Sequence, residues 1–336
     1  MKSRINITQI AKMAGVSKTT VSRVLNNKPD VKAESREKIE RIIKKYNYYP
    51  NAYAKAVSNK KSNTICAVIP HDASYVFSNP YYSEILRGVS QMTNANNYQL
   101  LLSFSDDGKY VDIAKEQRAD GIILISPSCE DYDQIDELVD MAMPLVSASK
   151  VLNSQFVCHI CVNDSKGAYL ATEHLLNLGH KKIGFINGPY NLASSRDRYE
   201  GYASALKQKG ISVDETFTQE GRNSLESGYE SMQKLLKNVN LTAVVVSSDL
   251  MAIGAIKAVN EAGKKVPDDI SIVGFDDIPF APYVNPPLTT INQDAYFKGM
   301  AVAEKLIQII NNENVEYRTT MDVELKIRES TTRCKA

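Results

Sequence analysis

Small polar and basic side chains gather in a short segment near the N-terminus. Lys18 and Thr19 stand at the start of an expected helix, where lysine can donate to guanine O6 and N7 and threonine offers a hydroxyl and a methyl group. Residues better suited to phosphates or flanking bases surround them: Ser17, Thr20, Ser22, Arg23 and Asn26. These residue types predict contacts with double-stranded DNA. The alternative is that Ser17 only caps a helix and Arg23 is only a solvated charge.

The apolar pattern predicts helices that hold these side chains. Between residues 7 and 46, apolar residues recur three, four and seven positions apart, a spacing typical of amphipathic helices too short to be stable alone. We expect a first helix capped by Thr8 and ending at about Met13, a turn at Gly15, and a second helix from Lys18 to about Asn26. A third helix, rich in Lys and Arg, begins at about Ser35. This arrangement predicts a helix-turn-helix, whose second helix enters the major groove of DNA.

The charge distribution favours a nucleic-acid partner. Residues 1–61 hold 15 of the 40 Lys and Arg but 4 of the 39 Asp and Glu, which gives this segment a net charge of +11. The other 275 residues carry a net charge of −10. A basic N-terminal part on an acidic body indicates binding to a polyanion. The alternative is a solvated basic tail, and the regular apolar spacing argues against it.

Composition excludes several other classes of protein. With 336 residues, 43% hydrophobic and 24% charged, the chain is long enough for about two domains and ordinary for a globular protein. We expect no membrane span, because no apolar run approaches the ~18–20 residues required, and no export signal after the basic N-terminus. The five cysteines are sparse and odd in number, which favours reduced thiols and a cytoplasmic location.

Metal, cofactor and catalytic chemistry find no support in the sequence. Cys158 and Cys161 form a C-x-x-C pair, but positions i and i+3 of the expected strand face opposite sides, and no second pair completes a zinc site. The histidines are scattered, and the motifs of nucleotide-binding loops, nucleophile elbows and metalloproteases are missing. We therefore expect no enzyme activity, no cofactor and no metal.

Three short motifs in residues 7–51 are distinctive. They are Ala14-Gly15-Val16-Ser17, Thr20-Val21-Ser22-Arg23-Val24-Leu25-Asn26 and Tyr48-Tyr49-Pro50-Asn51. With them the segment resembles the headpiece of the lactose-repressor/galactose-repressor (LacI/GalR) family of bacterial transcriptional regulators. The resemblance implies a sequence-specific DNA-binding regulator, and Thr8, Tyr48 and Asn51 complete the candidate DNA contacts of the headpiece.

The family resemblance also implies a hinge helix, from Asn51 to about Ser58, that folds when two subunits lie side by side on DNA. A leucine of that helix usually wedges into the minor groove and kinks the duplex. This sequence has Val57 at that place, and Lys55 where arginine is common. Because valine is one methylene shorter, worth ~0.8 kcal/mol of apolar burial, we expect a shallower wedge. The alternative is that Val57 packs only against the partner subunit.

From Thr64 onward, strand-like apolar runs alternate with helical segments, which predicts parallel sheets covered by helices on both faces. The expected strands are 65–69, 99–103, 121–125, 144–147, 159–162, 182–186, 243–247, 271–275 and one near 323–327. The expected helices include 82–94, 166–178, 196–207, 225–236, 251–261 and 297–310. These are too many strands for one sheet, so we expect two doubly wound α/β lobes with ligands bound between them, at the carboxyl ends of strands.

Motifs of the body extend the resemblance, among them Leu86-Arg87-Gly88, Asp249-Leu250-Met251-Ala252 and Pro287-Leu288-Thr289-Thr290-Ile291. The implied architecture is similar to periplasmic sugar-binding proteins, with three crossovers between lobes. It divides the chain into a headpiece (1–50), a hinge and linker (51–62) and a core (63–330). Within the core, the first lobe comprises 63–161 and 293–321, and the second comprises 162–292 and 322–330.

Two departures from the family pattern stand out. The segment between Ser103 and Asp120 is short, so we expect its helix to be trimmed. At Asn163-Asp164 the usual Asp-Asn order is reversed, which leaves the role of that pair open.

The resemblance implies that Arg198 and Asp249 face a small effector. A planar donor fork and a two-oxygen acceptor suit the vicinal hydroxyls of a sugar, or a purine edge. Tyr81 and Tyr82 match positions that supply an aromatic wall, and Asp276, at another strand end, is a further candidate. The alternatives are a helix cap for Asp249, a surface ion pair for Arg198 and core packing for the tyrosines.

We expect a repressor that binds a pseudo-palindromic operator as a homodimer, with half-sites about one DNA turn apart. A small effector, most simply a sugar, would control it from the cleft. A dimer is favoured over a tetramer because the chain ends soon after Arg328. Two alternatives stay open: a cytoplasmic solute-binding protein or sugar-modifying enzyme with a vestigial basic head, and a purine-responsive regulator of the same architecture.

Overall fold

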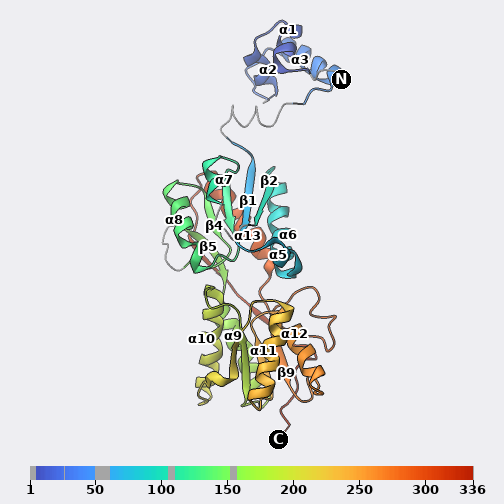
Figure 1. Cartoon of the computed structure of the whole chain (residues 1–336). Helices are drawn as coiled ribbons and strands as arrows, with labels where there is room; N and C mark the ends of the chain where they lie inside the picture. The colour runs from blue at the N-terminus through green and yellow to red at the C-terminus, as the bar shows by residue number, and fades with distance from the viewer. Residues whose placement is uncertain (1–4, 26, 50–60, 105–109, 152–156, 336) are drawn as a thin grey trace. The chain divides into compact units, whose positions relative to one another are not determined.

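The chain folds as two separate units in the computed structural model, Met1–Ser62 and Asn63–Ala336. The structure describes residues 5–25, 27–49, 61–104, 110–151 and 157–335. Each unit has its own buried apolar cluster. Figure 1 gives the order of the elements along the chain.

The N-terminal unit consists of three helices, α1 (Ile7–Ala14), α2 (Lys18–Leu25) and α3 (Ala33–Tyr46). None is long enough to be stable alone, so burial of a shared apolar face stabilises all three. Ile10, Val21 and Ile39, one from each helix, are fully buried at the centre of this cluster. The predicted helix-turn-helix is confirmed.

The caps of these helices are partly as predicted. Gly15 ends α1 in the left-handed conformation, with φ 69°, and Ser17 Oγ accepts a hydrogen bond from Thr20 N at 3.1 Å. The prediction that Thr8 caps α1 is wrong, because Asn6 does so. Asn6 Oδ1 accepts from Gln9 N at 3.0 Å, and Gln9 Oε1 accepts from Asn6 N at 2.9 Å, which satisfies two free donors at once. The third helix begins two residues before the predicted Ser35.

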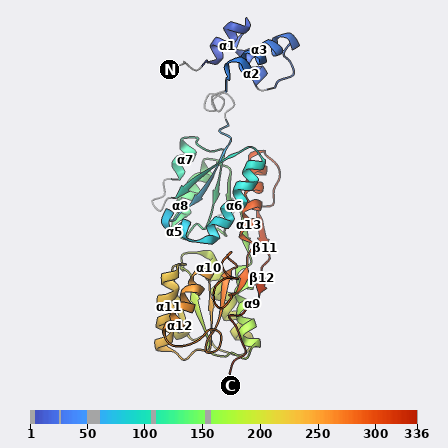
Figure 2. The same cartoon turned by 90° about the vertical axis from the view of Figure 1, so that its right-hand side faces the viewer.

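The first sheet of the large unit is wholly parallel, in the order β11-β5-β4-β3-β1-β2. Its strands are β1 (Thr64–Ile69), β2 (Gln99–Phe104), β3 (Gly121–Leu124), β4 (Leu145–Ser147), β5 (Cys158–Val162) and β11 (Arg318–Met321). One face packs against α5 (Ala73–Ser78), α6 (Pro80–Ala95) and α13 (Ala295–Ile310), and the other against α7 (Val111–Lys115) and α8 (Tyr132–Asp140) (Figure 2). The five-residue α7 is the trimmed helix that the short segment predicted.

The second sheet has the order β12-β10-β9-β8-β6-β7. Its strands are β6 (Ile183–Asn187), β7 (Thr218–Glu220), β8 (Ala243–Val246), β9 (Ser271–Asp276), β10 (Thr289–Asn292) and β12 (Glu324–Lys326). The strands run parallel except β12, which pairs antiparallel with β10. The helices α9 (Asp164–Asn177) and α10 (Ala193–Gln208) cover one face, and α11 (Leu225–Asn238) and α12 (Asp249–Glu261) cover the other. The prediction of two doubly wound lobes is confirmed.

The chain passes three times between the two sheets. The passages lie between Val162 and Asp164, between Asn292 and Ala295, and between Met321 and Glu324. Among the described residues, no helix combines the length and apolar character that a bilayer crossing demands.

A close contact between α6 and α13 fixes two helices that later supply binding side chains. A Cβ placed on Gly88 of α6 would overlap the Tyr296 carbonyl oxygen, and one on Gly299 of α13 would overlap the Ile85 carbonyl oxygen. Glycine is required at both positions because the two backbones approach too closely for any side chain.

Candidate functional site

The N-terminal unit presents one polar face of α2. Lys18, Thr19 and Arg23 are exposed, whereas Val21 and Val24 on the other side of the helix are buried. Arg23 pairs with Asp30 at 3.1 Å, with both side chains 53% exposed. An exposed pair of this kind is worth about 0–1 kcal/mol, so it leaves the guanidinium available to a phosphate.

The other candidates for DNA contact have different surroundings. Thr8 is exposed, Ser22 is half-buried and Tyr48 packs against the apolar cluster of this unit. Ser17 Oγ lies 2.9 Å from Thr20 Oγ1 as well as capping α2. Four candidates and the expected hinge helix lie outside the described residues: Asn26, Asn51, Lys55 and Val57.

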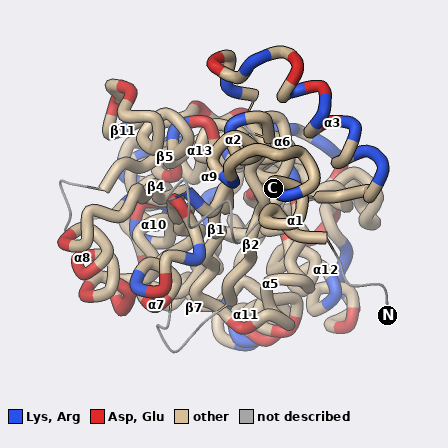
Figure 3. Tube along the Cα trace, turned by 90° about the horizontal axis from the view of Figure 1, so that it is seen from above, with Lys and Arg blue, Asp and Glu red and all other residues tan. Residues whose placement is uncertain are grey.

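The helix α3 carries both signs of charge. Basic and acidic positions alternate along it, and its last turn is basic through Lys44 and Lys45 (Figure 3). Cations at a helix C-terminus are favoured by the helix dipole, so these lysines have a structural role whether or not they meet DNA.

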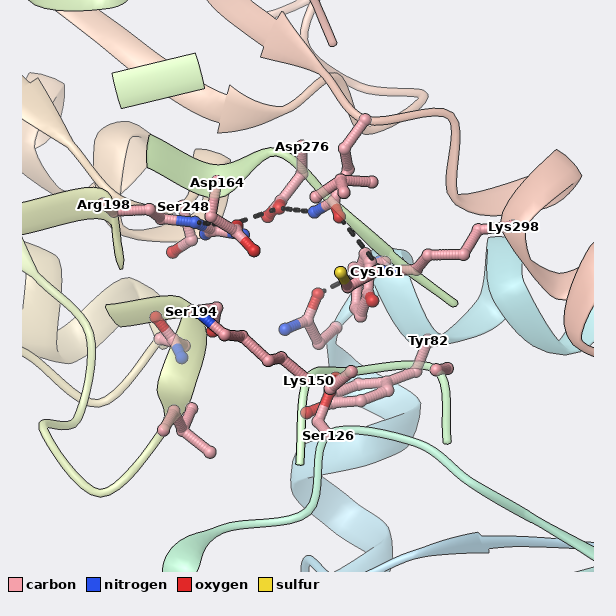
Figure 4. A pocket seen from close by; sticks show the side chains of 18 of the residues that line it. Tyr82, Ser126, Lys150, Cys161, Asp164, Ser194, Arg198, Ser248, Asp276 and Lys298 are labelled. Carbon is pink, nitrogen blue, oxygen red and sulfur yellow. Dashed lines mark hydrogen bonds and ion pairs between the residues drawn. The ribbon is translucent and has the colours of Figure 1, made fainter. Parts of the chain in front are cut away.

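The large unit contains a cavity between its two sheets that is open to solvent. The cavity is lined where strands end, as expected for open α/β sheets. The polar side chains that line it are Asn79, Ser126, Ser149, Lys150, Asp164, Ser194, Arg198, Asn223, Ser248, Asp276, Gln293 and Lys298 (Figure 4).

Arg198 on α10 is the centre of a buried charge network. Its Nε donates to Asp164 Oδ1 at 2.8 Å, and its Nη1 lies 4.0 Å from Asp276 Oδ1, with side-chain exposures of 8–11% for the three residues. The guanidinium also lies over the Phe275 ring, 3.7 Å from its centroid. Burial opposes the charged form of Arg198, but the carboxylates of Asp164 and Asp276 outweigh it and raise its pKa.

The reversed Asn163-Asp164 order now has a physical account. Asn163 Oδ1 caps α9 by accepting from Lys166 N at 3.0 Å. Asp164, the first residue of α9, is thereby free to pair with Arg198. The exchange of the two residues keeps a good cap and moves the carboxylate into the cavity wall.

Asp276 ends β9 with backbone that non-glycine residues rarely adopt. Its φ is 122°, and that of Asp277 is 55°. Such strain is typical of functional sites, where surrounding contacts hold the backbone in place. Here Gln293 Nε2 donates to Asp276 Oδ1 at 2.5 Å, and Arg328 Nη2 lies 2.6 Å from Asp277 Oδ1.

Burial raises the pKa of Asp276 to about 6, against the opposing effect of Arg198. At Asp276 the folded core therefore binds more protons than the unfolded chain between about pH 4 and pH 6, and the stabilising effect of this carboxyl group is lost as the pH rises through that window. We expect the free energy of unfolding of D276N to fall less steeply with rising pH than that of the unaltered protein. Urea denaturation at pH 4.5 and pH 6.5 measures the difference, and equal slopes would contradict it.

The structure does not bring Asp249 to the cavity. The residue is fully buried; its Oδ1 accepts from the Thr290 hydroxyl at 2.5 Å, and its Oδ2 accepts from Ile278 N at 2.9 Å. The side-chain cap of α12 is Ser248, whose Oγ accepts from Met251 N at 3.4 Å. Asp249 thus fastens the segment after β9 to α12, and burial, together with Asp276, raises its pKa.

Tyr81 and Tyr82 both line the cavity and also pack in or against the apolar core of the first lobe. The aromatic wall and the core packing, which were considered as alternatives, therefore both apply. Tyr82 is 4% exposed, and its ring centroid lies 5.3 Å from that of Tyr81 and 5.8 Å from that of Tyr75. These edge-to-face contacts hold the rings rigidly on one side of the cavity.

Sequence analysis missed several polar residues of the cavity, namely Lys150, Ser248, Gln293 and Lys298. Lys150 lies three residues after the end of β4 and Ser248 two residues after the end of β8, so the rule that ligands meet strand ends could have found them. Gln293 follows a strand that was not predicted. Lys298 lies inside a predicted helix, where nothing local marks it.

The C-x-x-C pair faces two ways, as predicted. Cys158 lies in the buried apolar cluster beside α13, whereas Cys161 lines the cavity with its Sγ 3.8 Å from Thr320 Oγ1. Both thiols are free. The described part of the chain contains no group of three His, Cys, Asp or Glu side chains arranged for a metal ion.

A helix-turn-helix unit joined to a two-lobed α/β receptor defines a ligand-responsive DNA-binding regulator. Residues 6–51 match the family described as bacterial regulatory proteins, lacI family, and residues 172–331 match a periplasmic binding protein-like domain. The chain belongs to the lacI family of bacterial regulatory proteins.

Similarity to individual proteins extends over nearly the whole chain. It is 36% identical to the probable HTH-type transcriptional repressor ExuR of Bacillus subtilis, over 98% of this chain and 99% of that protein. The structure of the lac repressor dimer bound to operator and the anti-inducer ONPF is 28% identical in sequence and has a TM-score of 0.86. The match covers 98% of this chain and 100% of the lac repressor chain. The complex of the regulator CelR with cellobiose is 30% identical, covers 97% and 100%, and has a TM-score of 0.76.

These findings confirm the predicted family and fold. The protein is a DNA-binding transcriptional regulator and not an enzyme, which contradicts the alternative of a solute-binding protein or sugar-modifying enzyme.

Proposed function

We propose that this regulator is a repressor that binds a pseudo-palindromic operator as a homodimer and is controlled by a sugar in the cavity. The observation that carries the proposal is the network of Asp164, Arg198 and Asp276 facing a wall of tyrosines. Fixed carboxylate acceptors and guanidinium donors beside aromatic rings suit the hydroxyls and apolar faces of a sugar.

The relatives support the ligand class and the assembly. The CelR structure is a complex with cellobiose, and the lac repressor structure is a dimer on its operator. A purine edge would also suit an arginine and carboxylate pair, so purines form a second ligand class for the test. Any ligand that weakens operator binding must itself bind less tightly to the operator complex, because coupling between two sites is reciprocal.

We assign the roles along the chain as follows. Residues 1–50 form the headpiece, 51–62 the hinge and linker, and 63–330 the core. Val57 is assigned as a shallow wedge into the minor groove, and Lys55 as a further DNA contact. Lys18 and Thr19 read base edges, and the remaining headpiece candidates contact phosphates or flanking bases. We place the protein in the cytoplasm, where its DNA lies and where its free thiols stay reduced.

Replacement of Lys18 by alanine tests the base-reading role. We expect K18A to lose about 1–3 kcal/mol of binding at one operator position and to discriminate less among bases there, because one donor to a base edge is removed. Fluorescence anisotropy with single-base operator variants measures the effect. K12A, on α1, is the matched control. A loss of equal size on every sequence would make Lys18 a phosphate contact instead.

Selection of genomic fragments tests the whole proposal. The purified protein should retain a small set of fragments against competitor DNA, with affinity that falls steeply as salt is raised. Addition of sugars and purines to the bound fragments then identifies the ligand class. Retention of no preferred fragment, with or without these compounds, would contradict the proposal.

A further inference from the structure

The cavity holds a lysine whose charge lacks a carboxylate partner. Three basic side chains line the cavity: Lys150, Arg198 and Lys298. Lys150 Nζ lies 3.2 Å from Asp197 Oδ2, and Arg198 pairs with Asp164. Among the described residues, no Asp or Glu oxygen lies within 4.0 Å of Lys298 Nζ.

Lys298 is nevertheless 3% exposed. Its Nζ donates to Gln293 Oε1 at 3.2 Å and lies 5.1 Å from the Tyr81 ring centroid. The side chain reaches from α13 toward Cys161 and the interior of the cavity (Figure 4). An ammonium has three donors, and one amide oxygen satisfies only one of them.

Gln293 separates Lys298 from the nearest acidic group of the network. Its Oε1 accepts from Lys298 while its Nε2 donates to Asp276 at 2.5 Å. Both acidic residues that line the cavity, Asp164 and Asp276, are thus engaged by Arg198 and Gln293. A ligand entering the cavity meets the remaining donors of Lys298 rather than an intact ion pair.

The position of Lys298 on its helix adds to the positive potential. It is the fourth residue of the 16-residue α13, in the first turn, where the helix dipole is positive. A cation there is unfavourable, and burial makes it more so. The exposed Asp294, whose carboxylate caps the helix by accepting from Phe297 N at 3.4 Å, faces the backbone amides instead.

We propose that the effector is an anionic sugar whose acidic group binds at Lys298, while Asp164, Arg198 and Asp276 hold its hydroxyls. This inference rests on the proposed function and specifies the ligand class of the same cavity. An anion at Lys298 supplies the missing counter-charge and accepts the free donors of the ammonium. Such charge-assisted hydrogen bonds are about twice as strong as neutral ones.

Calorimetry on the full chain with matched sugars tests the inference. The pairs are galactose with galacturonate and glucose with glucuronate, and glucose 6-phosphate distinguishes a phosphate from a carboxylate. We expect an acidic member to bind about tenfold or more tightly than its neutral counterpart, the effect of a hydrogen bond to a charged group. The stronger of the carboxylate and phosphate arms identifies the acidic group.

Variants of α13 locate the effect. K298M keeps the apolar stem and removes the charge, so it should abolish the preference for the acid. K305M, on the same helix but not among the residues that line the cavity, is the matched control and should keep the preference. K298R, which retains a cation, should keep part of it and serves if K298M fails to fold.

The outcomes separate this inference from the function on which it rests. A neutral sugar that binds as tightly as its acid, or equal losses for both in K298M, would overturn the inference and leave a sugar-controlled repressor intact. Operator release by purines and by none of the sugars would overturn the sugar proposal itself.

Discussion

Removal of residues 1–62 is expected to abolish operator recognition and to leave ligand binding unchanged. The helix-turn-helix lies wholly within this unit, whereas the cavity is built from residues 75–298 of the other. Loss of the headpiece removes all specific contacts, so binding should fall by about 10³-fold or more to the non-specific level. Anisotropy with the operator and calorimetry with the ligand measure the two activities on the same truncated protein.

The intact protein, assayed in parallel with operator and with a scrambled duplex, is the control for this truncation. Recognition of the operator by the truncated core as tight as that of the whole chain would refute the assignment of DNA binding to the helix-turn-helix.

Replacement of Arg198 by methionine should produce the largest loss of stability among single substitutions in the cavity. R198M leaves Asp164 and Asp276 buried without their cationic partner, and removal of one member of a buried ion pair costs about 3–5 kcal/mol. Urea denaturation of the core measures the loss, and calorimetry should register no binding of the ligand.

R196M is the matched control, because Arg196 lies on the same helix but is exposed and forms no ion pair among the described residues. Its effect should stay within about 0.5 kcal/mol, as for most surface substitutions. Equal stability of R198M and R196M would contradict a stabilising role for the pairing of Arg198 with Asp164 and Asp276.

The regular parts of the fold were predictable from the sequence because they repeat a simple pattern. Apolar strand cores such as that of β8 and the three-and-four spacing of α1–α3 mark their elements directly. The strands β7, β10 and β11 were missed because they are short and polar. In β10 the buried threonines are held by hydrogen bonds to distant partners: Thr290 donates to Asp249 Oδ1 at 2.5 Å, and Thr289 N donates to Ser330 Oγ at 2.8 Å.

The cavity was predictable only in part, for a related reason. Arg198 and the two tyrosines were found through their motif, whereas Gln293 and Lys298 meet Asp276 only after the chain has crossed between lobes. Asp249 was expected to face the ligand, but the residue that lines the cavity is its neighbour Ser248. Ser248 begins the turn before α12 and lines the cavity, and the next side chain points into the core instead.

The three passages between the lobes have a mechanical consequence. In the first sheet the passages connect to β5 and β11, the two strands at one edge of that sheet. In the second sheet they connect to β10 and β12, which also form one edge. Because all three connecting segments lie at these edges, sliding of one lobe over the other would stretch at least one of the segments. The permitted motion is therefore a hinge rotation of one lobe relative to the other, about an axis near these three segments, with each sheet remaining rigid. A ligand bound by residues of both lobes would set the angle of that hinge rotation.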